Sequence, residues 1–281
     1  MPRSQGNCRS GQNGGCQIGR GCHFAPVTSS SPLPTLTLPL PPPALLDGAA
    51  LFLDFDGTLV PIADSPDDVA ADQALLDLLT VLQEGLAGRL AIVSGRSVDA
   101  LRAMGLGDFM LAGTHGLEFA APGGAVEAPH RLTAIDTIET RFRDFAADWP
   151  GVLVERKSIS VGLHYRGAPA SADAAQALAV SLAAEHDLVV QRGKMLFEVR
   201  PGGADKGSAV LSLMRRAPFT DGVPVFFGDD VTDEEGFDAV TGLGGYGILV
   251  GPSRDTAASF SLEQVEAVRH YLGQEAARLG R

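Results

Sequence analysis

The segment AALFLDF at residues 49–55, which is apolar up to Asp54, constrains the fold of this chain more than any other feature. Uninterrupted apolar runs are typical of strands that are buried on both faces, as in parallel sheets covered by helices. Similar runs follow at 89–93 and 109–113, and residues 72–86 between the first two have helical spacing. This strand–helix–strand order predicts an α/β fold with an open parallel sheet and helices on both faces.

The middle of the chain has a different pattern, typical of an α+β unit in which adjacent strands lie beside two helices. Its two helical and four strand-like segments are 133–149 and 171–186, then 152–158, 158–167, 187–193 and 194–201. From residue 203 the α/β pattern resumes, and it ends in a helix near 261–279. We therefore expect a Rossmann-like core at 46–116 and 201–281, with a smaller α+β cap inserted at 117–200.

Residues 1–45 show neither the strand nor the helix period, and they are glycine-rich and then proline-rich. We expect them to form a disordered N-terminal extension. The three cysteines, Cys8, Cys16 and Cys22, all lie there, and their spacing lacks the close pair of a zinc site. The rest of the chain has no cysteine, which is typical of proteins in the reducing cytoplasm, and we expect this protein there. The sequence has no run of 18 apolar residues, so we expect no transmembrane helix.

The charge of the chain limits its partners. The formal net charge is −12. Nucleic acids and anionic membranes bind clustered Lys and Arg, so we expect neither as a partner. A small anionic substrate remains compatible with this charge, because a pocket can be basic on an acidic protein. We expect a monomer that binds a small molecule.

Two carboxylates stand where the first buried strand ends. Asp54 and Asp56 are two residues apart, so in extended backbone they point to one side while Phe55 turns into the core. Ligands of open α/β sheets bind beyond the carboxyl ends of the strands. One carboxylate there can attack phosphorus, and the other can transfer the proton of the alcohol and the water. Gly57 permits a sharp turn, and Thr58 offers a hydroxyl and an N–H to phosphate oxygens.

Three further motifs suit the same phosphate chemistry. Ser94, followed by Gly95 and Arg96, stands at the exit of the second strand, where its hydroxyl can hold a phosphoryl group. Lys206 stands at a helix start, and its ammonium can neutralise phosphate and nucleophile. An acidic group follows a third buried strand: Asp229, Asp230 and Asp233. With Asp54, it would form a hard-oxygen site of the Mg²⁺ type.

In this order, the four motifs resemble those of the haloacid dehalogenase superfamily of phosphatases. The resemblance implies that Asp54 is the nucleophile and Asp56 the general acid and base. It also implies that Mg²⁺ is held by Asp54, the backbone carbonyl of Asp56 and Asp229, with Asp230 and Asp233 as ligands or as supports of the ligands. The long interval between Ser94 and Lys206 places the cap between the second and third motifs. Members with a cap there usually act on small phosphorylated metabolites.

The inserted segment carries a signature of its own. Residues 111–118, 155–169 and 193–207 read LAGTHGLE, ERKSISVGLHYRGAP and GKMLFEVRPGGADKG. Together with GDDVTDEEGF, these segments resemble the trehalose-6-phosphate phosphatase family from about residue 51 to 272. The resemblance implies Mg²⁺-dependent hydrolysis of trehalose 6-phosphate through an aspartyl-phosphate. Arg200 stands where this family often has a lysine, and it keeps the positive charge.

A disaccharide site needs carboxylates, lysines and backbone groups in a fixed pattern. On the expected cap strands we assign this role to Glu155, Lys157, Lys194 and Glu198. The resemblance places Lys194 and Glu198 at the distal glucose. We expect His115 and Gly116 to meet the sugar at the cap hinge. For His164 and Arg166 two readings stay open: a sugar contact, or a buried histidine and an arginine paired with a cap carboxylate.

Three other functions compete with this one. One is hydrolysis of another sugar phosphate, such as that of sucrose or glucosylglycerol, and the cap signature disfavours it. A non-catalytic sugar-phosphate sensor would be expected to lack Asp54 or Asp56, and both are present. A phosphomutase would usually carry its cap between the first two motifs, where there is room for about one helix.

Overall fold

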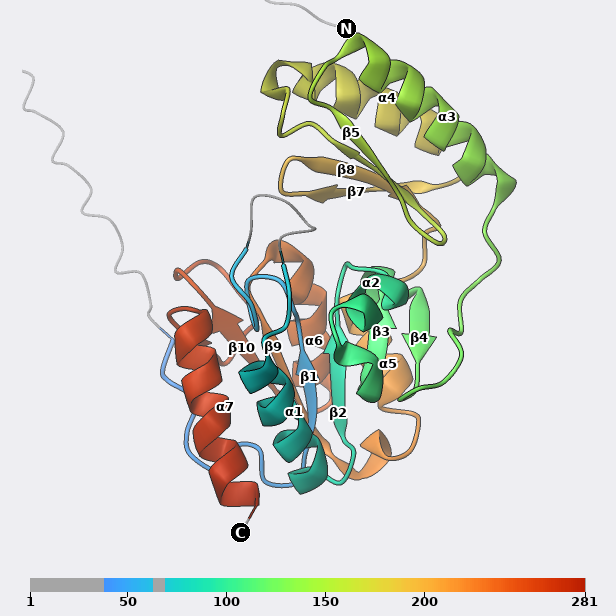
Figure 1. Ribbon diagram of the computed structural model, residues 1–281. Coiled ribbons are helices and arrows are strands. Elements are labelled where there is room, and N and C mark those ends of the chain that lie inside the picture. The colour runs from blue at the N-terminus through green and yellow to red at the C-terminus, as the bar shows by residue number, and fades with distance from the viewer. Residues whose placement is uncertain (1–37, 63–68, 281) are drawn as a thin grey trace, which may run out of the picture. The chain divides into compact units, whose positions relative to one another are not determined.

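The computed structural model describes residues 38–62 and 69–280, and within them the chain forms two β-sheets (Figure 1). The larger sheet has the strand order β11-β10-β9-β1-β2-β3-β4. Its strands are β1 (Ala49–Leu53), β2 (Leu90–Val93), β3 (Met110–Gly113), β4 (Glu118–Ala120), β9 (Val223–Gly228), β10 (Tyr246–Val250) and β11 (Phe260–Leu262). Every neighbouring pair is parallel except β3 and β4.

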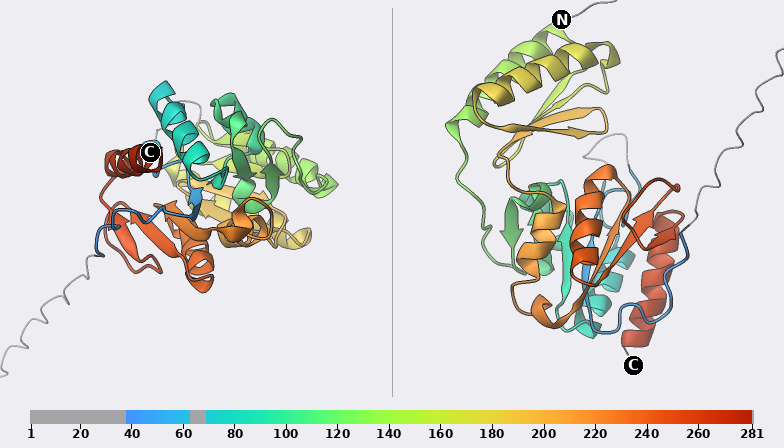
Figure 2. Two further views of the ribbon diagram at one scale, coloured as in Figure 1. Left: turned by 90° about the horizontal axis from the view of Figure 1, so that it is seen from below. Right: turned by 180° about the vertical axis from the view of Figure 1, so that it is seen from behind.

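Helices cover both faces of this sheet, as the apolar runs predicted (Figures 1 and 2). The core helices are α1 (Gln73–Gly85), α2 (Val98–Ala103), α5 (Lys206–Leu213), α6 (Glu234–Gly242) and α7 (Val265–Leu279). Within β1, Leu51 and Leu53 belong to the cluster formed with α1 and α7. Phe52 belongs to the opposite cluster with α5 and α6. Since successive strand residues point to opposite faces, burial on both sides requires an unbroken apolar sequence.

The smaller sheet forms the cap and is antiparallel, with the order β5-β6-β8-β7. Its elements are α3 (Thr133–Asp148), β5 (Leu153–Arg156), β6 (Val161–His164), α4 (Ala172–Glu185), β7 (Val189–Gly193) and β8 (Leu196–Arg200). The two helices pack on one face of the sheet and enclose an apolar core of their own. The opposite face carries the polar side chains of the site described below.

Two expected boundaries differ from the structure. β4 (Glu118–Ala120) pairs with β3 in the core sheet, so residue 117 is not where the cap begins. The apolar character of this short strand does not reveal which sheet it joins. In addition, residues 260–262 form the edge strand β11 before α7 begins at Val265, where the sequence predicted one longer helix.

The expectation that the whole of 1–45 is a disordered extension is wrong for residues 38–45, while residues 1–37, including the cysteines, lie outside the described residues. The backbone at 38–46 runs along β11 and α7 (Figure 1). The Ser261 N–H donates to the Pro39 carbonyl at 3.0 Å, and the Tyr271 hydroxyl donates to the Pro42 carbonyl at 2.9 Å. Such a segment is held by hydrogen bonds rather than by a repeating apolar pattern, and for this reason its sequence resembles a tail.

No helix in the described part of the chain has the length and apolar character needed to cross a membrane.

Candidate active site

The acidic motifs meet because β1 and β9 are parallel neighbours whose carboxyl ends lie at one edge. Asp54 follows β1, and its N–H donates to the Phe227 carbonyl of β9 at 2.9 Å. Asp229 follows β9. Gly57 has φ +86°, and a Cβ on it would lie 2.1 Å from Asp229 Oδ2. Glycine at this turn therefore permits both the left-handed backbone and the close approach of the second carboxylate.

Lys206 ties the two acidic motifs together. Its Nζ lies 2.8 Å from Asp54 Oδ1 and 2.6 Å from Asp233 Oδ1, and all three residues are buried. Asp233 Oδ2 accepts the N–H groups of Asp229 and Asp230 at 3.0 and 2.9 Å. Asp205 caps α5, so Lys206 is held at a fixed place at the start of this helix. Asp233 thus positions the ammonium and the acidic loop, with both oxygens engaged.

The pKa values in this cluster reflect burial and crowding. Burial, with the negative charges of Asp233 and Asp229, raises the pKa of Asp54 well above its usual range against the opposing effect of Lys206. Burial and Asp233 raise the pKa of Asp229 to about 6. Burial acts to lower the pKa of Lys206, but the carboxylates of Asp233 and Asp54 outweigh it and raise that pKa. The site therefore favours additional positive charge.

The same edge fits a divalent cation. One carboxylate oxygen from each of Asp54, Asp229 and Asp233 lies within 4.8 Å of the others. Asp229 Oδ1 is buried and has no hydrogen-bond partner among the described residues. Hard cations such as Mg²⁺ take carboxylate and carbonyl oxygens. Because both oxygens of Asp233 are already engaged, the donors that fit are the carboxylates of Asp54 and Asp229.

Asp56 and Ser94 flank this cluster on the side of β2. Arg96 binds Asp56 with two hydrogen bonds, Nε to Oδ2 at 2.6 Å and Nη2 to Oδ1 at 2.7 Å. Ser94 is buried, and its Oγ accepts the Arg96 N–H at 3.1 Å. The loop after β2 therefore presents a hydroxyl, backbone groups and a guanidinium to the acidic edge. A phosphoryl group is recognised by donors of these kinds.

The cap strands present a second polar cluster. Glu198 on β8 is buried, and its two oxygens accept from Lys157 Nζ and Ser160 Oγ, each at 2.6 Å. Burial acts to raise the pKa of Glu198, but the Lys157 ammonium outweighs it and lowers that pKa. On β5, Glu155 accepts a 2.8 Å contact from His164 Nε2. The strands β5, β6 and β8, with the turn between β5 and β6, thus bring together carboxylates, an ammonium and an imidazole that can bind sugar hydroxyls.

A cavity of about 480 Å³ joins the two clusters. Most of the sequence-predicted residues line it: Asp54, Asp56, Ser94, Gly95, Arg96, His115, Glu155, Lys157, Lys194, Glu198, Lys206, Asp229 and Asp230. Three predicted residues do not: Thr58, Gly116 and Asp233. The Thr58 side chain is fully buried, and Gly116, at φ +90°, packs where a Cβ would lie 2.7 Å from the Asp205 carbonyl. Thr58 and Gly116 therefore shape the turns beside the site.

Sequence reasoning missed several lining residues. Ser97 and Thr232 add polar groups on the core side, and Leu153 and Leu196 add apolar surface on the cap side. His164 and Arg166, for which two roles stayed open, both line the cavity. Ser97 had a usable signal, because it precedes a helical pattern and its Oγ accepts the Ala100 N–H as an N-cap. The apolar lining residues carried no signal that separates them from ordinary strand residues.

Comparisons with known proteins show which family this chain resembles. Residues 52–266 match the family model described as trehalose-phosphatase. The chain is 38% identical over 228 residues to a probable trehalose-phosphate phosphatase of Sinorhizobium fredii, covering 80% of this chain and 86% of the relative. It is also 38% identical over 233 residues to the trehalose-6-phosphate phosphatase of Escherichia coli, covering 82% and 87%.

Among solved structures, the C-terminal domain of Candida albicans trehalose-6-phosphate phosphatase is similar to this chain, with a TM-score of 0.73 and 26% identity. The match covers 86% of this chain and 99% of that one. It therefore includes the core and the cap together.

Proposed function

This chain belongs to the trehalose-phosphatase family, and from that premise we propose that it hydrolyses trehalose 6-phosphate to trehalose and inorganic phosphate. We place its core in the haloacid dehalogenase superfamily. The observation that carries the proposal is the cavity in which a buried Lys–Asp cluster on the core faces a Lys–Glu cluster on the cap. The first suits a phosphoryl group, and the second suits sugar hydroxyls.

Asp54 is the nucleophile in this proposal. One of its oxygens attacks phosphorus, and the bond between phosphorus and the sugar O6 breaks, which leaves a phosphoryl group on Asp54. Lys206, 2.8 Å from Asp54 Oδ1, orients the carboxylate and neutralises the charge of the incoming phosphate. A Mg²⁺ ion held by Asp54 and Asp229 would supply further positive charge to the phosphoryl oxygens.

Asp56 transfers protons at the neighbouring position. It gives a proton to the departing sugar O6, and it later takes one from the water that attacks phosphorus and releases phosphate from Asp54. In the structure Arg96 binds both oxygens of Asp56. We expect the Arg96 guanidinium to turn to the phosphate when substrate binds, because Asp56 can exchange a proton with the sugar oxygen and the water only when its oxygens are free of Arg96.

The cap cluster recognises the disaccharide in this proposal. Glu155 on β5 and Glu198 on β8 line the cavity, as do Lys157 in the turn between β5 and β6 and Lys194 in the turn between β7 and β8. Because Lys157 pairs with Glu198 and Glu155, these three side chains are held in place before the substrate arrives, which lowers the entropic cost of binding. We further propose that the protein acts as a cytoplasmic monomer.

The test is phosphate release from a panel of sugar phosphates by the full chain, with and without Mg²⁺. We expect trehalose 6-phosphate to have the highest kcat/KM, and EDTA to abolish turnover. Sucrose 6-phosphate, glucosylglycerol phosphate and glucose 6-phosphate are the matched alternatives. A higher kcat/KM for any of them would replace the assigned substrate, and turnover undiminished by EDTA would exclude the metal.

A further inference from the structure

One turn of the cap touches the core. Residues 157–160 join β5 to β6 at the rim of the cavity. Lys157 Nζ donates to the Gly95 carbonyl at 3.3 Å, next to the phosphate-side loop. The adjacent Ser158 Oγ donates to Glu118 Oε1 on β4. Two successive residues of the turn therefore reach two different elements of the core.

Glu118 is the buried acceptor of the hydrogen bond from Ser158. Its side chain is 1% exposed, and its Oε2 accepts the Val98 N–H at 2.7 Å, at the start of α2. The space around it is filled, because a Cβ on Gly113 would lie 2.7 Å from the Val98 nitrogen and 3.1 Å from Glu118 Oε2. The carboxylate is thus fixed between β4 and the loop that carries Ser94 and Arg96.

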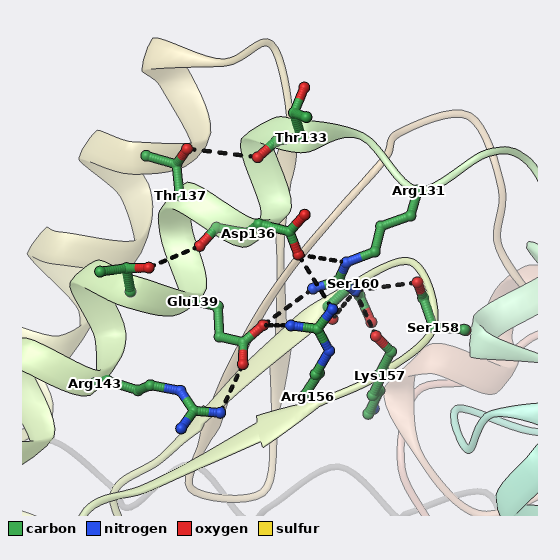
Figure 3. Close-up of polar contacts among 11 residues, drawn as sticks. Arg131, Thr133, Asp136, Thr137, Glu139, Arg143, Arg156, Lys157, Ser158 and Ser160 are labelled. Atoms are coloured by element: carbon green, nitrogen blue, oxygen red, sulfur yellow. Dashed lines mark hydrogen bonds and ion pairs between the residues drawn. The ribbon is translucent and has the colours of Figure 1, made fainter.

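Arg131 holds the turn from the cap side (Figure 3). This residue ends the connection from the core, directly before the N-cap of α3. Its Nη1 donates to the carbonyls of Lys157 at 2.5 Å and Ser158 at 3.0 Å. Its Nε and Nη2 donate to α3, to Asp136 at 2.8 Å and Glu139 at 3.2 Å. One guanidinium therefore joins the connection, the helix and the turn, a geometry that the planar fork of arginine permits and an ammonium does not.

We propose that Arg131 and Glu118 are positioning residues for the reaction. Arg131 fixes the shape of the turn at 157–160, and Glu118 anchors that turn to the core by accepting a hydrogen bond from Ser158. The contact sets the distance between the sugar-recognising Lys157 and the phosphate-side loop at Gly95. This proposal rests on the proposed function for its substrate and for the sugar-binding role of Lys157. Its effect is confined to substrates large enough to bridge cap and core, because a small phosphate ester binds to the core alone.

Kinetics on the full chain tests the consequence. Arg131→Met and Ser158→Ala should each raise KM for trehalose 6-phosphate about tenfold and leave kcat/KM for p-nitrophenyl phosphate within about twofold. Ser158→Thr keeps the hydroxyl and should restore the KM. Arg143→Met is the matched control, since Arg143 binds Glu139 at 2.7 Å in the same cluster without touching the turn. Equal losses on both substrates, or an Arg143→Met effect as large as that of Arg131→Met, would overturn the proposal.

Hydrogen exchange tests the positioning itself without any substrate. The Lys157 N–H donates to the Ser160 carbonyl at 3.1 Å, so this amide reports on the shape of the turn. Arg131→Met should speed its exchange at least about tenfold, and Arg143→Met should leave it unchanged. If wild-type protein prefers another sugar phosphate, the assigned substrate fails while the exchange result still decides the role of Arg131. Unchanged exchange in Arg131→Met would refute that role.

Discussion

At the residue scale, Lys206 makes the acidic edge compatible with a folded core. Carboxylate oxygens within 4.8 Å of one another repel strongly when they are shielded from water. The Lys206 ammonium lies 2.8 Å from Asp54 and 2.6 Å from Asp233, so it offsets part of this repulsion, while Asp229 has no cationic partner among the described residues. Removing one member of such a buried group costs about 3–5 kcal/mol, because the remaining charge stays buried. The lysine therefore stabilises the fold, and in the proposed mechanism it also serves the chemistry.

Asp54→Asn should abolish turnover and leave the fold intact. The amide keeps the shape of the carboxylate and can still accept a hydrogen bond from Lys206, but it cannot attack phosphorus. Steady-state phosphate release, with circular dichroism as the folding control, measures both effects. Residual activity within about tenfold of wild type, against enzyme enhancements of about 10⁶ or more, would exclude Asp54 as nucleophile.

His115 should make the free energy of unfolding depend on pH. Burial lowers its pKa from 6.5 to about 3, so between these values the unfolded chain binds a proton that the folded chain does not. Stability from this group is therefore lost as pH falls below 6.5, by at most about 2 kcal/mol down to pH 5. The raised pKa of Asp229 affects stability in the same pH range with the opposite sign, because here the folded chain binds the proton more readily than the unfolded chain.

The test therefore compares how the free energy of unfolding depends on pH in wild type and in a variant without His115. Asn tolerates a positive φ such as the +53° of His115, so His115→Asn is the matched variant. Urea unfolding of both chains from pH 7.5 to 5 should show a steeper decline for wild type. Parallel curves would mean that His115 is protonated as readily in the folded state as in the unfolded one.

At the scale of elements, the segment at 38–46, which we call the strap, is hydrogen-bonded to the last helix, α7. Glu275 of α7 is buried, and its two oxygens accept the N–H groups of Ala44 at 3.0 Å and Leu46 at 3.3 Å. Arg278 lies 2.7 Å from the same carboxylate. An irregular segment cannot satisfy its own backbone, so a buried side chain of the helix does so. The strap thereby leads directly into β1, the central strand that ends at Asp54.

Two truncations separate the strap from the residues before it. Removal of 1–37 should leave the melting temperature unchanged, as the polar and proline-rich sequence predicts. Removal of 1–44 should lower it by at least about 5 °C, because several buried hydrogen bonds worth about 1 kcal/mol each are lost and Glu275 loses a donor. Differential scanning fluorimetry measures both. Equal melting temperatures for the two truncations would show that the strap contributes no stability.

At the scale of the whole molecule, the core and the cap line one cavity, and our proposal assigns the chemistry to the core and the selection of substrate to the cap. The core supplies the buried Lys–Asp cluster, and the cap supplies the Lys–Glu cluster. Each unit has its own apolar core, so either can vary without repacking the other. If hydrolysis requires the core to bind the phosphate and the cap to bind the sugar, its rate depends on the contacts that hold the cap against the core.

Mg²⁺ should stabilise the whole chain as well as activate it. A ligand at 100 times its Kd adds about 2.7 kcal/mol, and in a chain of this size that corresponds to about 5–10 °C. Asp229→Asn should remove the thermal shift, because it loses a charged donor. Asp238→Asn, an exposed carboxylate of α6, should keep the shift. A shift retained in Asp229→Asn would place the ion elsewhere.

The sequence by itself determined the α/β class, the inserted cap and most of the lining residues. It could do so because buried parallel strands must be apolar throughout, and their polar exits then mark the ligand edge. Asp54, Ser94, Lys206 and Asp229 were found in this way. Their signals are local, since each stands at a strand end or a helix start.

Only the tertiary structure decided the contacts between distant segments. The pairing of β4 with β3, the strap on α7 and the Arg131–turn–Glu118 contact join residues that local patterns treat separately. The same holds for Thr58 and Asp233, whose residue types suit a phosphate or a metal but whose side chains are buried beside the cavity. Hydrogen bonds and packing depend on positions in space, and those positions follow from the whole fold rather than from any window of sequence.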